Sequence, residues 1–144
     1  MNGYELFKEQ GDTPVASNKS INNGIGGYSS LKPTETGNII TFSDTTTSES
    51  IFYQPHDFIG YPHVQGLYAQ HNLQWSEHSL LYFVTLFRKC AEGRFDYANK
   101  FTREIASKMV VTLPVKQHDE IDFAFINDFI KAKEKLIIKE LFAQ

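Results

Sequence analysis

Residues 21–28, Ile-Asn-Asn-Gly-Ile-Gly-Gly-Tyr, have the residue types and spacing that most suggest a binding function. Glycine adopts positive φ without steric cost and asparagine tolerates it, so this composition predicts a compact turn or hairpin. A dinucleotide-binding glycine loop needs a helix directly behind it, and the sequence Tyr-Ser-Ser-Leu-Lys-Pro at residues 28–33 excludes one. The turn is therefore expected to present side chains rather than to cradle a phosphate.

The sequence lacks the common signatures of hydrolytic and transfer chemistry. No lysine follows an acidic residue by two positions, as a metal-dependent nuclease of the common restriction class requires, and no Asn-Pro pair begins an adenine methyltransferase motif. No Gly-x-Ser-x-Gly elbow is present either. We expect a chain with no catalytic activity of its own and no cofactor.

Histidine and cysteine offer little support for a metal site. His56, His63, His71 and His78 are widely spaced, without a His-Glu-x-x-His motif. Cys90 is the single cysteine, which excludes an internal disulfide and a cysteine zinc cluster. Ordinary loop histidines and a packing role for the thiol are the favoured interpretations.

Length and composition predict one compact domain. The 144 residues are 41% apolar and 14% aromatic, which is enough to build a core. No apolar run reaches the roughly 18 residues of a membrane span, and Glu5, Lys8 and Glu9 occupy the place of a signal peptide's apolar stretch. The expected location is cytoplasmic.

The net charge of −3 does not favour DNA binding, because lysine and arginine usually supply much of the affinity for phosphates. The cations are unevenly distributed, however, and six of them fall within one stretch: Arg88, Lys89, Arg94, Lys100, Arg103 and Lys108. On charge alone, a solvated face of mixed charge remains an open alternative to a DNA-binding surface.

The first half of the chain predicts short strands separated by long loops. Strands are expected near residues 15–16, 38–43 and 51–53, after a polar arm at residues 1–10. The polar run at residues 45–50 predicts an exposed hairpin tip whose hydroxyls can donate to DNA.

The second half is dominated by helices. Ser76 is a suitable N-cap for a buried helix that ends before Gly93, and Thr102 can cap a short helix that leads into a strand at residues 109–113. Asp122 can cap an amphipathic C-terminal helix. The predicted fold is α+β: a twisted mixed sheet with short strands and long loops, a buried central helix and a C-terminal amphipathic helix.

The order and spacing of these segments resemble the target recognition domain of type I restriction-modification specificity subunits. The resemblance covers about residues 11–142. The residues that carry it are Gly11 to Ser17, the turn at 21–28, Gly37 to Asp44, Ile51 to Tyr53, Phe58 to Gly60, Phe95 to Phe101, Leu113 to Val115, Ile121 to Phe125 and Phe129 to Ala132. The run at residues 116–120 departs from the glycine turn often found there. Specificity subunits usually contain two such domains, so the chain is expected to be a fragment, a half-subunit or a truncated product.

The resemblance implies an arm at residues 1–10, a DNA recognition domain at 11–120 and the start of a helical spacer at 121–144. The implied partners are double-stranded DNA, a methyltransferase subunit and a restriction subunit, with a homodimer or a second recognition domain as further possibilities. Side-chain chemistry and the resemblance together predict DNA contacts at Lys19, Asn22, Asn23, Tyr28, Thr45, Thr46, Arg94, Tyr97, Lys100 and Arg103. Gln54 is expected to contact adenine. Tyr28, Phe95 and Tyr97 can touch DNA, although aromatic residues at such points are more often core or loop supports.

Three other interpretations of the same sequence remain. The acidic balance and the apolar stripe of the last helix suit a protein-interaction module without DNA readout, such as a half-subunit that pairs with another copy. The specificity part of a fused restriction-methylation enzyme would look the same at this length. A small-ligand or carbohydrate binder is less favoured, because it would need a concave aromatic pocket.

Overall fold

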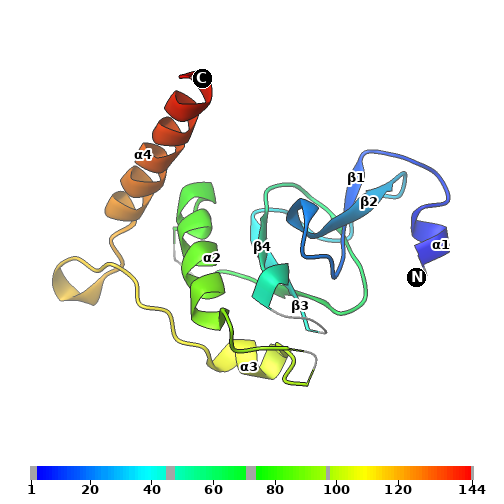
Figure 1. Cartoon of the computed structure of the whole chain (residues 1–144), viewed down its shortest axis with the longest axis horizontal. Helices are drawn as coiled ribbons and strands as arrows, with labels where there is room; N and C mark the ends of the chain where they lie inside the picture. Colours follow the sequence, from blue (N-terminus) through cyan, green and yellow to red (C-terminus); the bar gives the residue numbers. More distant parts are fainter. Residues whose placement is uncertain (1–2, 45–47, 71–73, 97, 144) are drawn as a thin grey trace.

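The computed structural model describes residues 3–44, 48–70, 74–96 and 98–143, and a β-rich half precedes a helical half (Figure 1). The elements of the first half are α1 (Gly3–Leu6), β1 (Thr13–Ala16), η1 (Asn22–Gly24), β2 (Ile25–Ser29), β3 (Ile39–Ser43), η2 (Ser48–Ser50), β4 (Phe52–Gln54), β5 (Ile59–Gly60) and β6 (Val64–Leu67). The second half contains α2 (Glu77–Ala91), α3 (Arg103–Lys108), η3 (Gln117–Asp119) and α4 (Phe123–Phe142). The predicted α+β class is confirmed.

The described strands form two three-stranded sheets rather than one mixed sheet. The first has the order β2-β1-β5, in which β1 is antiparallel to β2 and parallel to β5. The second has the order β4-β3-β6 and is wholly antiparallel. A small apolar cluster of Ala16, Ile39 and Phe58 joins the two sheets.

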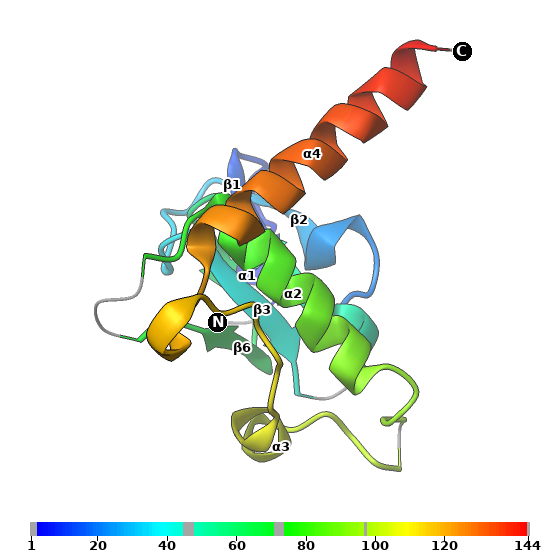
Figure 2. The same ribbon diagram turned by 90° about the vertical axis from the view of Figure 1, so that its left-hand side faces the viewer.

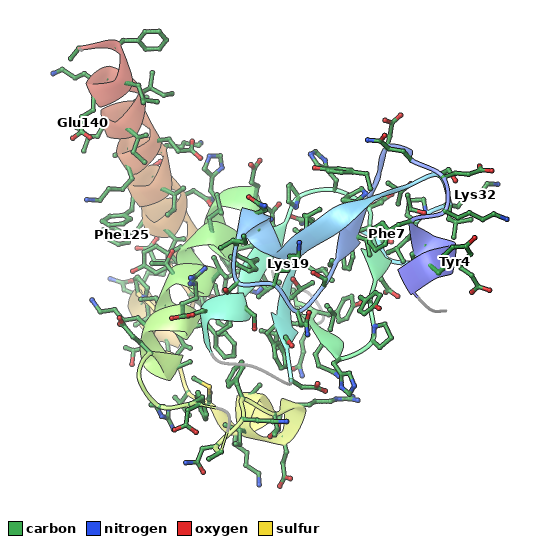
Figure 3. All side chains as sticks on the ribbon, turned by 45° about the vertical axis from the view of Figure 1, so that its right-hand side comes forward. Tyr4, Phe7, Lys19, Lys32, Phe125 and Glu140 are labelled. Carbon is green, nitrogen blue, oxygen red and sulfur yellow. The ribbon has the colours of Figure 1, made fainter. Side chains whose placement is uncertain are left out.

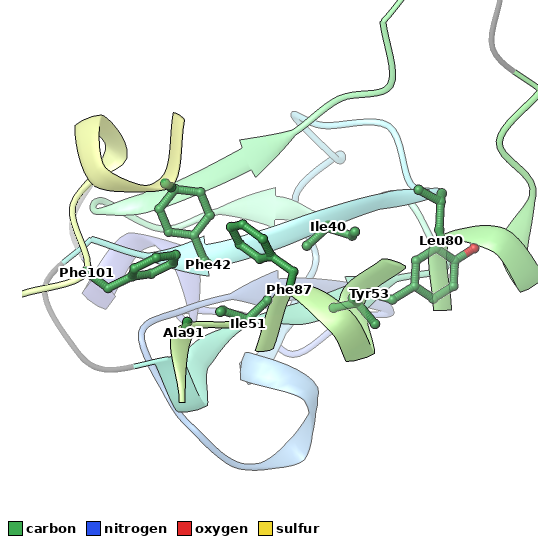
Figure 4. Close-up of a cluster of buried hydrophobic side chains, with 10 residues drawn as sticks. Ile40, Phe42, Ile51, Tyr53, Leu80, Phe87, Ala91 and Phe101 are labelled. Carbon is green, nitrogen blue, oxygen red and sulfur yellow. The ribbon is translucent and has the colours of Figure 1, made fainter. Parts of the chain in front are cut away.

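The main core lies between the second sheet and α2 (Figure 4). Strand β3 contributes Ile40 and Phe42, and α2 contributes Leu80, Val84 and Phe87, all of them buried. Because α4 covers a further part of α2, this helix has apolar neighbours on two sides (Figure 2). The predicted buried central helix is confirmed.

The predicted boundaries of the second-half helices are confirmed by their caps. Ser76 and Ser79 form a reciprocal capping box at the start of α2, and Gly93 follows its end with a φ of 71°. The Thr102 hydroxyl accepts from the backbone N–H of Ile105 at the start of α3. The Asp122 carboxylate likewise caps α4.

The strand predicted at residues 109–113 is absent from the structure. The segment follows α3 without joining either sheet, although its side chains alternate between half-buried and exposed, and Met109 and Val111 pack against the main core. Beyond it, Val115 and Ile121 form one isolated antiparallel bridge. The alternation that predicted a strand therefore reflects packing on one side, without a neighbouring strand for ladder hydrogen bonds.

Helix α4 packs on α2 through its first half and then projects beyond the body of the molecule (Figure 2). Trp75 contacts Phe123 at a ring-centroid distance of 5.1 Å, and Tyr82 contacts Phe129 at 5.7 Å. Only Ile126 is buried among the residues of α4. The part after Glu134 carries exposed apolar side chains: Leu136, Ile137, Ile138, Leu141 and Phe142.

Candidate nucleic-acid interface

Of the predicted turn at residues 21–28, only the part up to Gly24 closes the β1–β2 hairpin, because residues 25–28 already belong to β2; the turn borders a groove. In η1, Asn22 and Asn23 have φ values of 53° and 55°, and Gly24 follows at 76°. Strand β2 begins directly afterwards at Ile25, so no helix stands behind the glycines, as predicted. Between this hairpin and the loop at residues 54–57 the groove has a volume of about 690 Å³.

The residues that line this groove include two carboxylates, Asp12 and Asp57, and no lysine or arginine. Asp57 Oδ1 accepts a hydrogen bond of 2.8 Å from the Gly37 N–H, which fixes that carboxylate at the rim. Carboxylates repel phosphate oxygens but accept hydrogen bonds from amino groups, such as cytosine N4. The groove is therefore better suited to a base edge than to the DNA backbone.

Asn22 and Tyr28 present free side chains at this groove. Asn22 is exposed, and its amide makes no hydrogen bond to the residues that the structure describes. Tyr28 lies on β2 opposite Pro14 with 52% of its surface exposed. Both have the accessibility that a DNA contact requires.

Asn23 and Gln54 are hydrogen-bonded to each other, although Asn23 is exposed and Gln54 is buried. Asn23 Nδ2 donates to the Tyr53 carbonyl at 2.8 Å, and Gln54 Nε2 donates to the Asn23 carbonyl at 2.9 Å. Gln54 is only 2% exposed and its amide is engaged within the protein, which argues against the adenine contact predicted for it. The sequence around Gln54 did not predict this burial, because glutamine in a short strand next to a turn is usually exposed.

Lys19 lies on the connection between β1 and η1 with an exposed side chain (Figure 3). Its backbone N–H donates to Ser17 Oγ at 3.4 Å, and the Ser17 hydroxyl in turn donates to the Gly24 carbonyl at 3.0 Å. Lys19 is therefore the predicted cation that belongs to the same hairpin as Asn22 and Tyr28.

The other predicted cations form a second group on the connection from α2 to α3 and at the start of α3, away from the hairpin (Figure 1). Arg94, Lys100 and Arg103 are all exposed. Arg94 Nη1 donates to the Cys90 carbonyl at 3.2 Å, and its guanidinium lies 5.4 Å from the centroid of the Phe95 ring. The group is presented to solvent on a stretch that Phe95 anchors in the core.

Not every cation of the basic stretch is available. Arg88 Nη1 donates to the Ile51 carbonyl at 2.9 Å, and Lys108 pairs with Glu104 at 2.9 Å. The other predicted contacts, Thr45, Thr46 and Tyr97, lie outside the described residues. The structure thus separates the described candidates into two groups. The hairpin group consists of Lys19, Asn22, Asn23 and Tyr28, and the α2–α3 group consists of Arg94, Lys100 and Arg103.

Two tyrosines near the second sheet have perturbed ionisation. Burial raises the pKa of Tyr53, and the Glu77 carboxylate adds to this effect. The Tyr53 hydroxyl donates to Asn38 Oδ1 at 2.7 Å. Burial also raises the pKa of Tyr68, with a further contribution from Glu35, which accepts its hydroxyl at 3.2 Å. Both tyrosines therefore act as neutral hydrogen-bond donors.

The described residues include no cluster of three or more histidine, cysteine or acidic side chains that could hold a metal ion. In the same part of the chain, no helix is both long and apolar enough to cross a membrane.

A small α+β domain with an asparagine-bearing turn beside a groove and exposed cations on a second loop has the features of a DNA-recognition module. The chain matches the family model described as type I restriction modification DNA specificity domain over residues 3–142, and it belongs to this family. No curated protein and no solved structure matches it. The family is one of DNA-binding specificity domains that assemble with methyltransferase and restriction subunits in type I systems.

Proposed function

We propose that this chain reads one half of a split DNA target and positions the methyltransferase and restriction subunits on it, without catalysing a reaction itself. The observation that carries the proposal is the family match over residues 3–142. In this proposal residues 11–120 form the recognition unit, and residues 121–144 begin the spacer that leads to the partner subunits.

The hairpin group would read bases. Asn22 is exposed beside the groove, and an asparagine amide can donate and accept simultaneously, which matches N6 and N7 of adenine. The carboxylates at the groove disfavour phosphate and leave base edges as the suitable ligand. Tyr28 adds an exposed aromatic surface to the same groove.

The α2–α3 group would bind phosphates. Lys100 and Arg103 are exposed, and no ion pair occupies either of them within the described chain. Each phosphate that a protein cation neutralises adds about 0.9 to the slope of log K against log salt concentration. The two cations together therefore account for about 1.8 of that slope.

The test is binding of the purified chain to a randomised duplex pool at low and moderate salt, with sequencing of the retained DNA. The proposal expects one short enriched motif and an affinity that falls steeply with salt. Retention without any enriched motif would contradict base reading. No retention, together with a stable dimer in light scattering, would instead favour an interaction module.

Two pairs of variants separate the roles. Replacing Lys100 and Arg103 by glutamine should weaken binding to all duplexes and reduce the salt slope by about 1.8, whereas the same change at Lys131 and Lys135 on α4 should leave it unaltered. An unchanged slope would remove Lys100 and Arg103 from the contacts.

Asn22→Gly keeps the positive φ and removes the amide, so it should change the enriched motif at one position. The control is His118→Gly in η3, which has a φ of 64° in a turn remote from the hairpin and should leave the motif unchanged. A wild-type motif with Asn22→Gly would show that this amide reads no base.

A protein-interaction module is the second candidate, and the exposed end of α4 favours it. Leu136 is 53% exposed and Leu141 is 67% exposed, on a part of the helix that extends past its contacts with α2. Replacing both by glutamine should abolish assembly with a partner subunit or a second copy, without lowering thermal stability. Retained assembly would exclude this surface.

A further inference from the structure

Two amide side chains fasten η1, which belongs to the hairpin of the first sheet, to the edge strand β4 of the second sheet. Asn23 Nδ2 donates to the Tyr53 carbonyl at 2.8 Å and approaches Gln54 Oε1 at 3.4 Å. In return, Gln54 Nε2 donates to the Asn23 carbonyl at 2.9 Å. Because each residue supplies both a donor and an acceptor to the other, the turn has one preferred position on β4.

The Gln54 amide is itself held in place by the neighbouring strand β3. Its Nε2 also donates to Thr41 Oγ1 on β3 at 3.0 Å, so both of its N–H hydrogens are used. Gln54 is 2% exposed and Thr41 is 4% exposed. A buried amide that loses its partners is costly, because no water replaces them. Moving η1 would therefore leave the Gln54 amide unsatisfied.

The backbone of η1 needs this support. Asn22, Asn23 and Gly24 have consecutive positive φ values, a conformation that is strained for the two asparagines. On the opposite side, the Gly24 carbonyl accepts from the backbone N–H of Ser17 at 2.8 Å and from its hydroxyl at 3.0 Å. Strained backbone of this kind persists where its surroundings determine it, and it clusters at functional sites.

We infer that Gln54 is a positioning residue for sequence readout: without touching DNA, it holds η1 so that Asn22 meets a base edge in one register. The inference rests on the proposed function, because it assigns a cause to the specificity of the same groove. The same contacts hold η1 and β4 together. The second sheet, which contains β4, therefore determines the position of Asn22 in the hairpin of the first sheet.

The test compares Gln54→Leu with Gln65→Leu as the matched control. Gln65 lies on β6, the opposite edge strand of the same sheet, and its Nε2 donates to Asp44 Oδ2 at 2.9 Å. For each variant, duplex-pool selection gives the motif, and titration gives the affinities for the selected duplex and for an unrelated duplex. Circular dichroism melting reports the stability of each variant.

Gln54→Leu should reduce discrimination between the two duplexes by about tenfold or more, while affinity for the unrelated duplex at low salt stays within about twofold. Gln65→Leu should retain the motif and the discrimination. The second variant is Asn23→Gly, which keeps the positive φ but removes the amide contacts with β4, and it should lose discrimination in the same way.

Two outcomes would overturn the inference alone. In the first, Gln54→Leu and Asn23→Gly both keep the wild-type motif and discrimination. In the second, both duplexes lose affinity equally and in proportion to the fall in melting temperature, which would be a purely structural effect. If the wild-type chain selects no motif at all, the proposed function fails and this inference fails with it.

Discussion

Replacing Phe101 by alanine should remove a large fraction of the stability of the domain. Phe101 has no exposed surface, and its ring lies 4.9 Å from Phe95, 5.0 Å from Phe42 and 5.7 Å from Phe87, measured between centroids. Phenylalanine-to-alanine changes in cores cost about 3–5 kcal/mol, and the loss of three aromatic contacts argues against the lower end of this range. The expected loss is about 4 kcal/mol, against a total of roughly 5–15 kcal/mol for a typical protein.

Urea unfolding followed by circular dichroism measures this loss. With a slope of about 2 kcal/mol per M, the midpoint should fall by about 2 M. Phe142→Ala is the control: this ring is 86% exposed, and its removal should change the unfolding free energy by less than about 0.5 kcal/mol. A loss below about 1.5 kcal/mol at Phe101 would refute the idea that its ring joins the α2–α3 connection to β3.

Two further predictions concern α2 and the second sheet. Ser76→Ala removes the capping box and the hydrogen bond of 3.1 Å from Ser76 Oγ to Asn127 Oδ1. Thermal unfolding should therefore show a free energy of unfolding that is lower by about 1–2 kcal/mol. An unchanged free energy of unfolding would mean that water replaces the cap. Burial raises the pKa of Tyr53 above its ordinary 10.0, so the unfolded chain releases this proton first and the unfolding free energy should fall as pH rises above 10. In Tyr53→Phe the fall should be smaller, and an identical pH dependence in urea titrations would contradict this assignment.

The sequence predicted what local interactions determine. Ser76, Thr102 and Asp122 marked helix starts correctly, because a cap acts on backbone groups two or three residues away. The left-handed turn was also predictable, since asparagine and glycine are the residues that tolerate it. Local chemistry of this kind needs no knowledge of the rest of the fold.

The errors arose where a distant segment decides the outcome. The alternation at residues 109–113 is real, but a strand also needs a neighbour to pair with, and none of the described strands pairs with this segment. Likewise, the sequence around Gln54 predicts an exposed polar side chain. Its burial depends on η1, which is distant in sequence and whose Asn23 is hydrogen-bonded to Gln54. The candidate contacts were found as residue types, whereas their division between the hairpin and the α2–α3 connection required the structure.

The unpaired connection at residues 109–113 also affects how α4 is attached. Since neither sheet holds this connection by ladder hydrogen bonds, α4 stays on α2 through side-chain contacts such as Trp75 with Phe123 and His78 Nε2 with Glu134 Oε2, 3.2 Å apart. Domain swapping exchanges an identical element between two copies, and a terminal helix that follows an unpaired connection is the kind of element that such an exchange requires.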